Sequence, residues 1–288
     1  MSCKETEEKV ALTRVLGIDF SGNHLMWRTG CSTSNVWIAE ITFPEGQATL
    51  TGLCQVQRLS GSAPPFDRLV ADLGTGIYDA AGIDAPFSVP DAYVPHGGHR
   101  GLLLHVAGLP MRPGQPFPDG GTFAQSLIQQ AAVPYSVSKP FRITEQIWAS
   151  QGLSVRSTLW AGPRPGAPMT AACLTLLYRA GAPIWPWKPA STEGLLVEAF
   201  PMAQLFLWGL PFTGYNGNGV TPRTARRRII SGIQAYIVTT RFNAVLQSNA
   251  DALDAVVAGL AALAVKRGYL AFTSAPIAAR EGWIAVYA

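Results

Sequence analysis

The stretch Arg14-Val15-Leu16-Gly17-Ile18-Asp19-Phe20-Ser21-Gly22 contains an apolar run, then an aspartate, then a turn. Short apolar runs bounded by turn residues are typical of buried strands, so residues 14–20 predict a central strand. Aspartate is disfavoured inside strands and is costly to bury. Asp19, at the end of this run, therefore calls for a chemical reason, although it could simply cap backbone amides in the turn.

The same arrangement returns at residues 78–85, where Asp84 ends a second apolar run that Pro86 closes. Between the two runs, residues 36–43 and 48–59 predict a hairpin, and residues 64–73 have the apolar spacing of a helix. Two strands joined by a helical crossover pair in parallel and end at the same sheet edge. Because ligands of open α/β sheets gather at that edge, we expect Asp19 and Asp84 to act together.

The second half of the chain predicts one more strand and several helices. Residues 195–200 have the apolar character of a fifth strand. Residues 86–168 are rich in proline and glycine and predict a long, largely irregular insertion. Helices are predicted at residues 121–132, 169–180, 202–207, 221–239 and 250–267. For the last of these, Ser248 predicts a capping-box-like start and Gly268 a C-terminal stop.

Asp251 and Asp254 lie three positions apart on the predicted last helix, which places their Cβ atoms about 5–6 Å from each other. An acid in the first turn of a helix is favoured by the helix dipole, which is an ordinary explanation for Asp251. Asp254 lies beside an apolar stripe and lacks that explanation. Two like charges raise each other's pKa unless a cation lies between them, so the pair favours a metal site.

Three further groups of charged residues are weaker candidates. Glu198 lies inside the predicted fifth strand, where it is either a site residue or faces solvent by simple alternation. His96 and His99 form a HisxxHis pair in a glycine-rich loop, which predicts flexible surface histidines rather than metal ligands. Four arginines near the start of the 221–239 helix would grip phosphate or lie on its solvated face: Arg223, Arg226, Arg227 and Arg228.

The composition predicts a globular protein without a membrane-spanning segment. Of 288 residues, 48% are apolar and 14% are charged, which suits a buried core rather than disorder. No uncharged apolar run is long enough to cross a bilayer. The first residues carry three glutamates, so residues 1–13 predict a flexible tail rather than a signal peptide. Four dispersed cysteines predict mostly buried, reduced thiols in the cytoplasm: Cys3, Cys31, Cys54 and Cys173.

The net charge of +4 is unevenly distributed. Between Pro86 and Arg179, seven basic residues stand against three acidic ones. A loop-rich basic segment beside an acidic metal site can hold a polyanionic backbone, although an ordinary charged surface also explains the excess. The basic residues are Arg100, Arg112, Lys139, Arg142, Arg156, Arg164 and Arg179.

Five stretches in this order resemble the domain of unknown function 429 family: GIDFSG at 17–22, AGIDAPFSVP at 81–90, VEAFPMAQLFLWG at 197–209, DALDAVVAGLAAL at 251–263 and EGWI at 281–284. The resemblance spans nearly the whole chain. It implies an α/β, ribonuclease H-like fold with a five-stranded mixed sheet flanked by helices, formed by residues 14–288 as a single domain. It also implies a nuclease.

Related Holliday-junction resolvases have an acid at the end of the first strand, another at the end of the fourth, and two acids three apart on the last helix. Asp19, Asp84, Asp251 and Asp254 match these positions, and Glu198 matches a glutamate typical of the 429 family. We therefore expect a two-metal site for Mg²⁺ or Mn²⁺, in which Asp19 would bridge ions about 3.5–4 Å apart while Asp84 and the Asp251/Asp254 pair hold one each. The expected partner is nucleic acid, either DNA or RNA.

Two alternatives belong to other functional classes. GIDFSG also resembles the first phosphate loop of ATP-dependent phosphotransferases of the actin and sugar-kinase superfamily, which share the core fold. Such an enzyme needs a second glycine-rich phosphate loop in another half of the chain, and the sequence contains none. The other alternative is a non-catalytic binding protein that retains the carboxylates.

Overall fold

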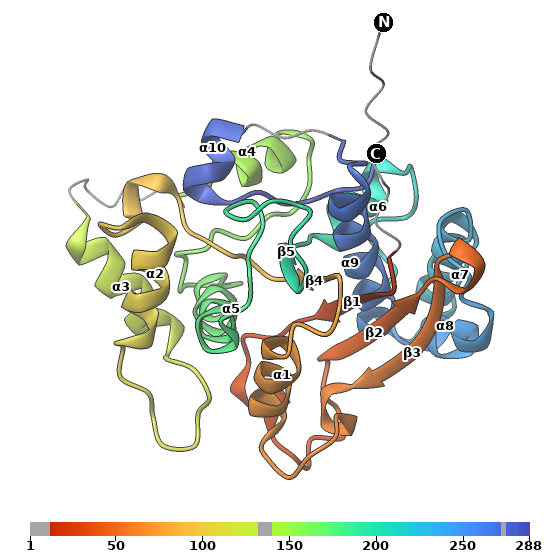
Figure 1. Ribbon diagram of the computed structural model, residues 1–288, viewed down its shortest axis with the longest axis horizontal. Helices are drawn as coiled ribbons and strands as arrows, with labels where there is room; N and C mark the ends of the chain where they lie inside the picture. Colours follow the sequence, from red (N-terminus) through yellow and green to blue (C-terminus); the bar gives the residue numbers. More distant parts are fainter. Residues whose placement is uncertain (1–11, 132–139, 272–274) are drawn as a thin grey trace, which may run out of the picture.

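Five strands form one mixed sheet in the order β3-β2-β1-β4-β5. The computed structural model describes residues 12–131, 140–271 and 275–288. β1 pairs antiparallel with β2 and parallel with β4, and β4 pairs parallel with β5. The β2–β3 hairpin and the α/β fold class are confirmed, and the architecture is consistent with a ribonuclease H-like fold (Figure 1). The strands are β1 Arg14–Asp19, β2 Trp37–Thr42, β3 Thr49–Gln55, β4 Ala80–Asp84 and β5 Leu195–Glu198.

Alternation along the strands divides the core into two layers. Val15 and Val197 face the layer that contains the last long helix, α9 (Ala250–Arg267). Their neighbours along the strands, Leu16 and Leu196, face the opposite layer. Because both faces are covered, the central strands are apolar at nearly every position, as buried strands are. The sheet is therefore the partition between two hydrophobic cores.

The helix α9 lies unusually close to the sheet because glycine occupies the contact points on both central strands. A Cβ atom at Gly17 would overlap the carbonyl oxygen of Ala255, and one at Gly82 would overlap that of Ala258. Gly17 and Gly82 are partners in the β1–β4 register, so together they form a shallow channel for the helix. This close approach brings the first turns of α9 to the carboxyl ends of β1 and β4.

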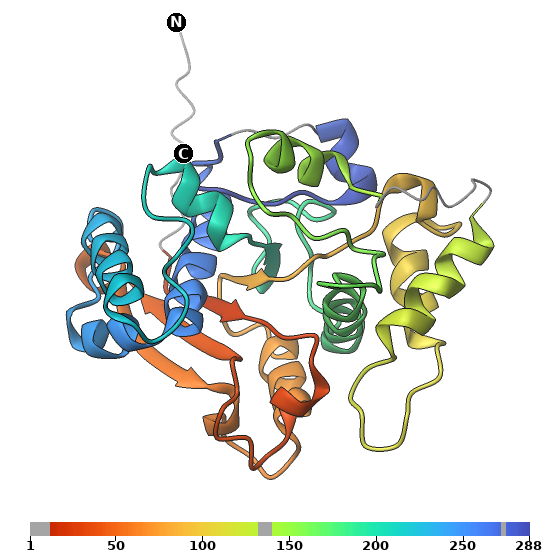
Figure 2. The same cartoon turned by 180° about the vertical axis from the view of Figure 1, so that it is seen from behind.

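Other helices cover the opposite face and the edges of the sheet (Figures 1 and 2). The helices α1 and α5 lie on the face opposite α9, and α2 and α3 pack against α5. The helices α7 and α8 lie beside the β2–β3 hairpin, on the α9 side. Their bounds are α1 Pro65–Gly74, α2 Gly98–Ala107, α3 Gly120–Gln130, α4 Ile143–Ser150, α5 Ala167–Ala180, α6 Pro201–Leu207, α7 Val220–Ile233, α8 Asn243–Ser248 and α10 Ala275–Glu281.

Several predicted boundaries differ from the structure for identifiable reasons. The helix α7 ends at Ile233 rather than near residue 239, because Val238 pairs with the start of β3 through two backbone hydrogen bonds of 2.9 Å. The N-cap of α9 is Asn249, whose side chain accepts a hydrogen bond from the Ala252 amide at 2.9 Å, so the Ser248 cap was wrong. Gly268 ends α9 with φ of 70°, as predicted. The 86–168 insertion is more helical than predicted, since it contains α2 and α4.

Three predictions concern the chain as a whole. Within the described ranges, no helix has the length and apolar character needed to span a bilayer. In the same ranges Cys173 is a buried free thiol, while Cys31 and Cys54 are free and half-buried, so the prediction of mostly buried thiols was too strong. Cys3 and nearly all of the predicted tail at residues 1–13 lie outside the described residues.

Candidate active site

The predicted meeting of Asp19 and Asp84 occurs at the carboxyl ends of the two central strands. The two residues are register partners on β1 and β4. Each lies two positions after the glycine that contacts α9, so alternation directs both side chains toward the same helix. Asp19 is only 8% exposed. The acids therefore converge on the space between the sheet edge and the start of α9.

Asp254 approaches this space from α9. It lies one position before Ala255, the residue whose carbonyl oxygen contacts Gly17. Its Oδ1 atom accepts a hydrogen bond of 2.8 Å from the hydroxyl group of Tyr215. Arg226 in turn holds the loop of Tyr215, donating to the backbone carbonyls of Tyr215 and Gly217. The position of Asp254 is thus set by a helix, a tyrosine and a buried arginine.

The electrostatic surroundings raise the pKa of each of these three carboxyl groups. Burial raises the pKa of Asp19 well above its ordinary value, and the charges of Asp254, Asp84 and Asp251 add to the rise. Burial raises the pKa of Asp84 to about 7, although the nearby Arg156 offsets part of this effect. Burial and the charge of Asp84 raise the pKa of Asp254, and the hydrogen bond from Tyr215 offsets part of this rise. Without a cation, this group of acids favours bound protons.

Asp251 is less closely involved than the other three aspartates. Burial raises its pKa, and its charge acts on Asp19 and Asp254. Its side chain lines a separate cavity of about 200 Å³ between the loop at Asn216–Asn218 and the residues at the start of α9. The structure therefore places Asp251 at the margin of the group.

Glu198 is buried, so the solvent-facing alternative does not hold, and it has a cation of its own. Its two carboxylate oxygens accept hydrogen bonds from Arg142, one of them at 2.8 Å, and one oxygen also accepts from the Phe87 amide at 3.1 Å. Arg142 also binds Glu145 at 3.0 Å. Burial alone would lower the pKa of Arg142, but Glu198 and Glu145 outweigh burial and raise it.

The same network attaches the insertion to the C-terminal segment. Glu281 accepts hydrogen bonds from the amide of Asp91 at 2.8 Å and from that of Ile143 at 2.7 Å. The backbone carbonyl of Glu281 also accepts from Arg142 at 3.3 Å. These contacts connect the stretches AGIDAPFSVP, VEAF and EGWI, which are far apart in the sequence. They fix one wall of the site.

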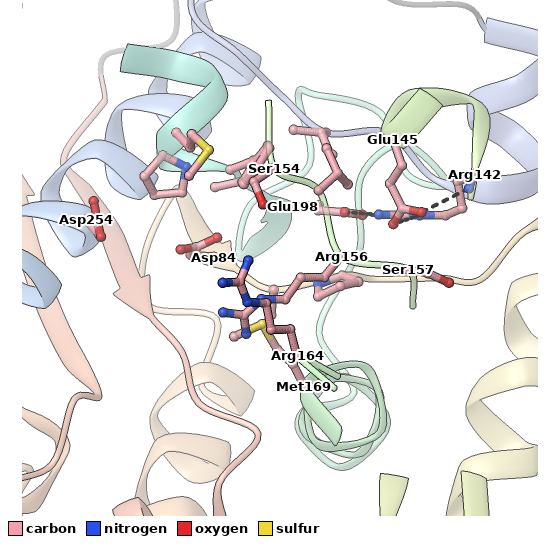
Figure 3. A pocket seen from close by; sticks show the side chains of 18 of the residues that line it. Asp84, Arg142, Glu145, Ser154, Arg156, Ser157, Arg164, Met169, Glu198 and Asp254 are labelled. Atoms are coloured by element: carbon pink, nitrogen blue, oxygen red, sulfur yellow. Dashed lines mark hydrogen bonds and ion pairs between the residues drawn. The ribbon is translucent and has the colours of Figure 1, made fainter. Parts of the chain in front are cut away.

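A cavity of about 480 Å³ opens between the aspartates and the insertion. Asp84 and Asp254 line it, whereas Asp19 does not. In Figure 3 the side chains of Arg156 and Arg164 project toward Asp84, and the pair of Glu198 and Arg142 lies further along the wall. The cavity therefore combines carboxylates on one side with two guanidinium groups on the other.

The side chains as they lie are not closed around an ion. In residues 12–131, 140–271 and 275–288, no group of three His, Cys, Asp or Glu side chains is arranged to hold a metal. The aspartates nevertheless supply the oxygen ligands that hard divalent cations prefer. None of Asp19, Asp84 and Asp254 forms an ion pair with another described residue. The donor chemistry fits Mg²⁺ or Mn²⁺, and closure around an ion requires side-chain movement.

Comparison with protein families assigns the chain. The model of the family described as "Protein of unknown function (DUF429)" matches residues 17–279. The chain belongs to this family. No curated protein and no solved structure gave a match. The match includes Asp19, Asp84, Glu198, Asp251 and Asp254, so every predicted site residue lies within the DUF429 region.

Two predictions about other residues of this DUF429 chain were wrong. His99 is not a flexible surface residue: its ring stacks on Trp187 with centroids 3.5 Å apart, and its Nε2 atom bonds the Phe87 carbonyl at 2.7 Å. Burial lowers the pKa of His99 to about 4, so it is a neutral core residue. Arg226 does not lie on a solvated helix face, since it is buried beneath the Tyr215 loop. Arg223, Arg227 and Arg228 are exposed.

Sequence reasoning did not identify Tyr215 as part of the site, and it placed Arg156 and Arg164 only within a general basic excess. Tyr215 lies in the glycine-rich loop GYNGNG, which carries no recognisable signal for a partner of Asp254. The two arginines are ordinary members of a proline-rich segment. Their place in the cavity depends on how the insertion folds over the sheet edge.

Proposed function

We propose that this protein hydrolyses phosphodiester bonds in nucleic acid with the help of Mg²⁺ or Mn²⁺. The observation that carries the proposal is the meeting of Asp19, Asp84 and Asp254, each without an ion pair among the described residues, beside a cavity. Carboxylates that raise each other's pKa are costly to keep charged, and a divalent cation removes that cost. Perturbed acids beside a cavity are typical of functional sites.

In this proposal Asp19, Asp84 and Asp254 hold the metal, with Asp251 at the margin. When bound, Mg²⁺ or Mn²⁺ would lower the pKa of an attacking water and stabilise the leaving oxygen. Tyr215 keeps one oxygen of Asp254 oriented through its hydrogen bond. We assign Glu198 to the wall of the site rather than to the reacting groups, because Arg142 and the Phe87 amide already occupy its oxygens.

The single sheet argues against a phosphotransferase. An enzyme of the actin and sugar-kinase type divides its phosphate loops between two halves of the chain. All five strands of the described residues belong to one sheet, so these residues contain no second sheet for another half. The segment after β4 instead builds helices and a loop that cover the sheet edge. This arrangement favours hydrolysis in one site over transfer between two halves.

The proposal is tested by incubating the purified protein with end-labelled DNA and RNA oligonucleotides in Mn²⁺ or in EDTA. We expect cleavage in Mn²⁺ only, and we expect Asp19→Asn to lower its rate by about 10²–10³-fold, as for loss of transition-state charge stabilisation. Mn²⁺ should also raise the melting temperature of the wild type, since a filled site stabilises the folded state. Asp19→Asn should lose that rise.

Asp72→Asn is a matched control, because Asp72 lies on α1 and does not line the cavity. This variant should cleave as the wild type does. Full activity of Asp19→Asn, or wild-type cleavage in EDTA, would refute the proposal.

A further inference from the structure

The 480 Å³ cavity is a partly open cleft walled by segments from distant parts of the chain. The insertion contributes residues 154–164, the turn after β5 contributes Phe200, and the loop after α6 contributes Tyr215. Its volume lies within the range of about 300–1,000 Å³ that small-molecule sites occupy. Asp84 and Asp254 belong to its lining, so a phosphate held in the cavity lies beside them.

Two arginines in the cavity have no fixed partner among the described residues. Arg156 lies close enough to Asp84 to counteract the rise of its pKa, yet the two form no ion pair. Arg164 projects toward the same carboxylate (Figure 3). Guanidinium groups bind phosphate oxygens through paired hydrogen bonds. Arg156 and Arg164 are therefore available to bind an anion in the cavity, beside Asp84 and Asp254.

The backbone holds Arg164 in an uncommon conformation. Its φ angle is 53°, in the left-handed region that side-chain-bearing residues seldom adopt. The surrounding loop imposes this geometry: the Trp160 carbonyl accepts hydrogen bonds from the amides of Gly166 at 3.0 Å and Ala167 at 3.1 Å. The Trp160 indole nitrogen donates to the Pro163 carbonyl at 2.8 Å. Conformations of this kind concentrate at ligand clamps, where the fold over-determines them.

Aromatic rings accompany the arginines. Trp160 and Phe200 are half-buried and line the cavity together with Met169. Single-stranded nucleic acid is bound by this combination of cationic groups for the backbone and aromatic faces for the bases. A base within a duplex is stacked and paired, so only an unpaired or extruded nucleotide can place its base against a side chain in a pocket.

We propose that this cavity binds one unpaired nucleotide, with Arg156 and Arg164 on its phosphate and Trp160 and Phe200 against its base. The substrate is then a single strand rather than a duplex. This inference rests on the proposed function, because it places the phosphate of that nucleotide beside Asp84 and Asp254. It adds the class of nucleic acid and the residues that select it.

The test is fluorescence anisotropy with a labelled octanucleotide, alone or annealed to its complement. Measurements are made in Ca²⁺, an oxygen-ligand cation with looser geometry than Mg²⁺, and a gel checks that the probe stays intact. The single strand should bind at least about tenfold more tightly than the duplex. The double variant Arg156→Gln and Arg164→Asn should lose about tenfold in affinity or more. Asparagine tolerates the left-handed backbone, so the second substitution removes the cation without new strain.

Arg112→Gln is the matched control, since Arg112 is an exposed arginine of the same insertion outside the cavity, and it should bind as the wild type does. Equal binding of duplex and single strand, or wild-type affinity in the double variant, would overturn the inference. Arginine-dependent binding without Mn²⁺-dependent cleavage would instead contradict the proposed reaction and leave the nucleotide site standing.

Discussion

Two groups of acids lie at the same end of the sheet, and they differ in how their charge is balanced. Glu198, at the end of β5, is neutralised by Arg142, which the insertion supplies. Asp19 and Asp84, at the ends of β1 and β4, have no ion-pair partner among the described residues, and neither has Asp254. A carboxylate paired with an internal arginine is part of the scaffold. Carboxylates left without one are available to bind a cation.

The comparison also explains the behaviour of the insertion. Residues 86–168 deliver Arg142 to a buried position and Arg156 and Arg164 to the cavity, so one segment both locks the wall and presents cations to a ligand. Arg142 is held by Glu198 and Glu145, whereas the other two arginines form no ion pair with described residues. The three arginines thus have different roles, because only Arg142 is buried and paired with acids.

The largest effect is expected from removing the charge of Glu198. Glu198→Gln leaves Arg142 buried with only part of its compensation, so we expect a loss of about 3–5 kcal/mol in the free energy of unfolding. Glu40→Gln is the control, because Glu40 pairs with Arg14 near the surface and should cost about 0–1 kcal/mol. Both are measured by denaturant unfolding. A folded Glu198→Gln protein that has lost Mn²⁺-dependent cleavage would return Glu198 to the reacting groups.

A smaller effect of opposite sign is expected at Asp84. Its pKa is raised from 3.8 to about 7, so the folded state favours the protonated form. The stabilisation from this group is complete below the unfolded value and is lost as the pH rises through about 7. In EDTA at pH 8, Asp84→Asn should therefore melt several degrees above the wild type, and the two should converge toward pH 4. Equal melting temperatures at pH 8 would show that Asp84 carries no uncompensated charge.

The smallest effect is expected at Tyr215. Tyr215→Phe removes the hydrogen bond to Asp254 and keeps the ring, so the fold should remain intact. Loss of a group that orients a metal ligand costs about 10–100-fold in metal affinity, and we expect the lower end because Asp254 remains fixed on α9. The measurement is the Mn²⁺ concentration that half-saturates the rise in melting temperature. Tyr269→Phe, an exposed tyrosine outside the cavity, should leave it unchanged.

The strands and the helix α9 could be predicted because their signals are local. Residues 14–19 and 80–84 are apolar runs that end in aspartate, and the ends of α9 follow from its composition and from Gly268. The helix α2 could not be predicted in the same way, because glycines at its start resemble a loop and its apolar face is defined only by packing against α5. His99 lies in the first turn of α2, so its burial could not be predicted from the glycine-rich sequence around it either.

By itself, the sequence determined that two buried strands end in aspartates and that two more acids lie on one turn of the long helix that became α9. Both patterns depend on residues close together in the chain. Only the tertiary structure decided which acids are neutralised. The pairing of Glu198 with Arg142 joins residues 56 positions apart, and the contact of Tyr215 with Asp254 joins residues 39 apart. Such contacts depend on how the insertion and α9 pack on the sheet, and no local pattern encodes that packing.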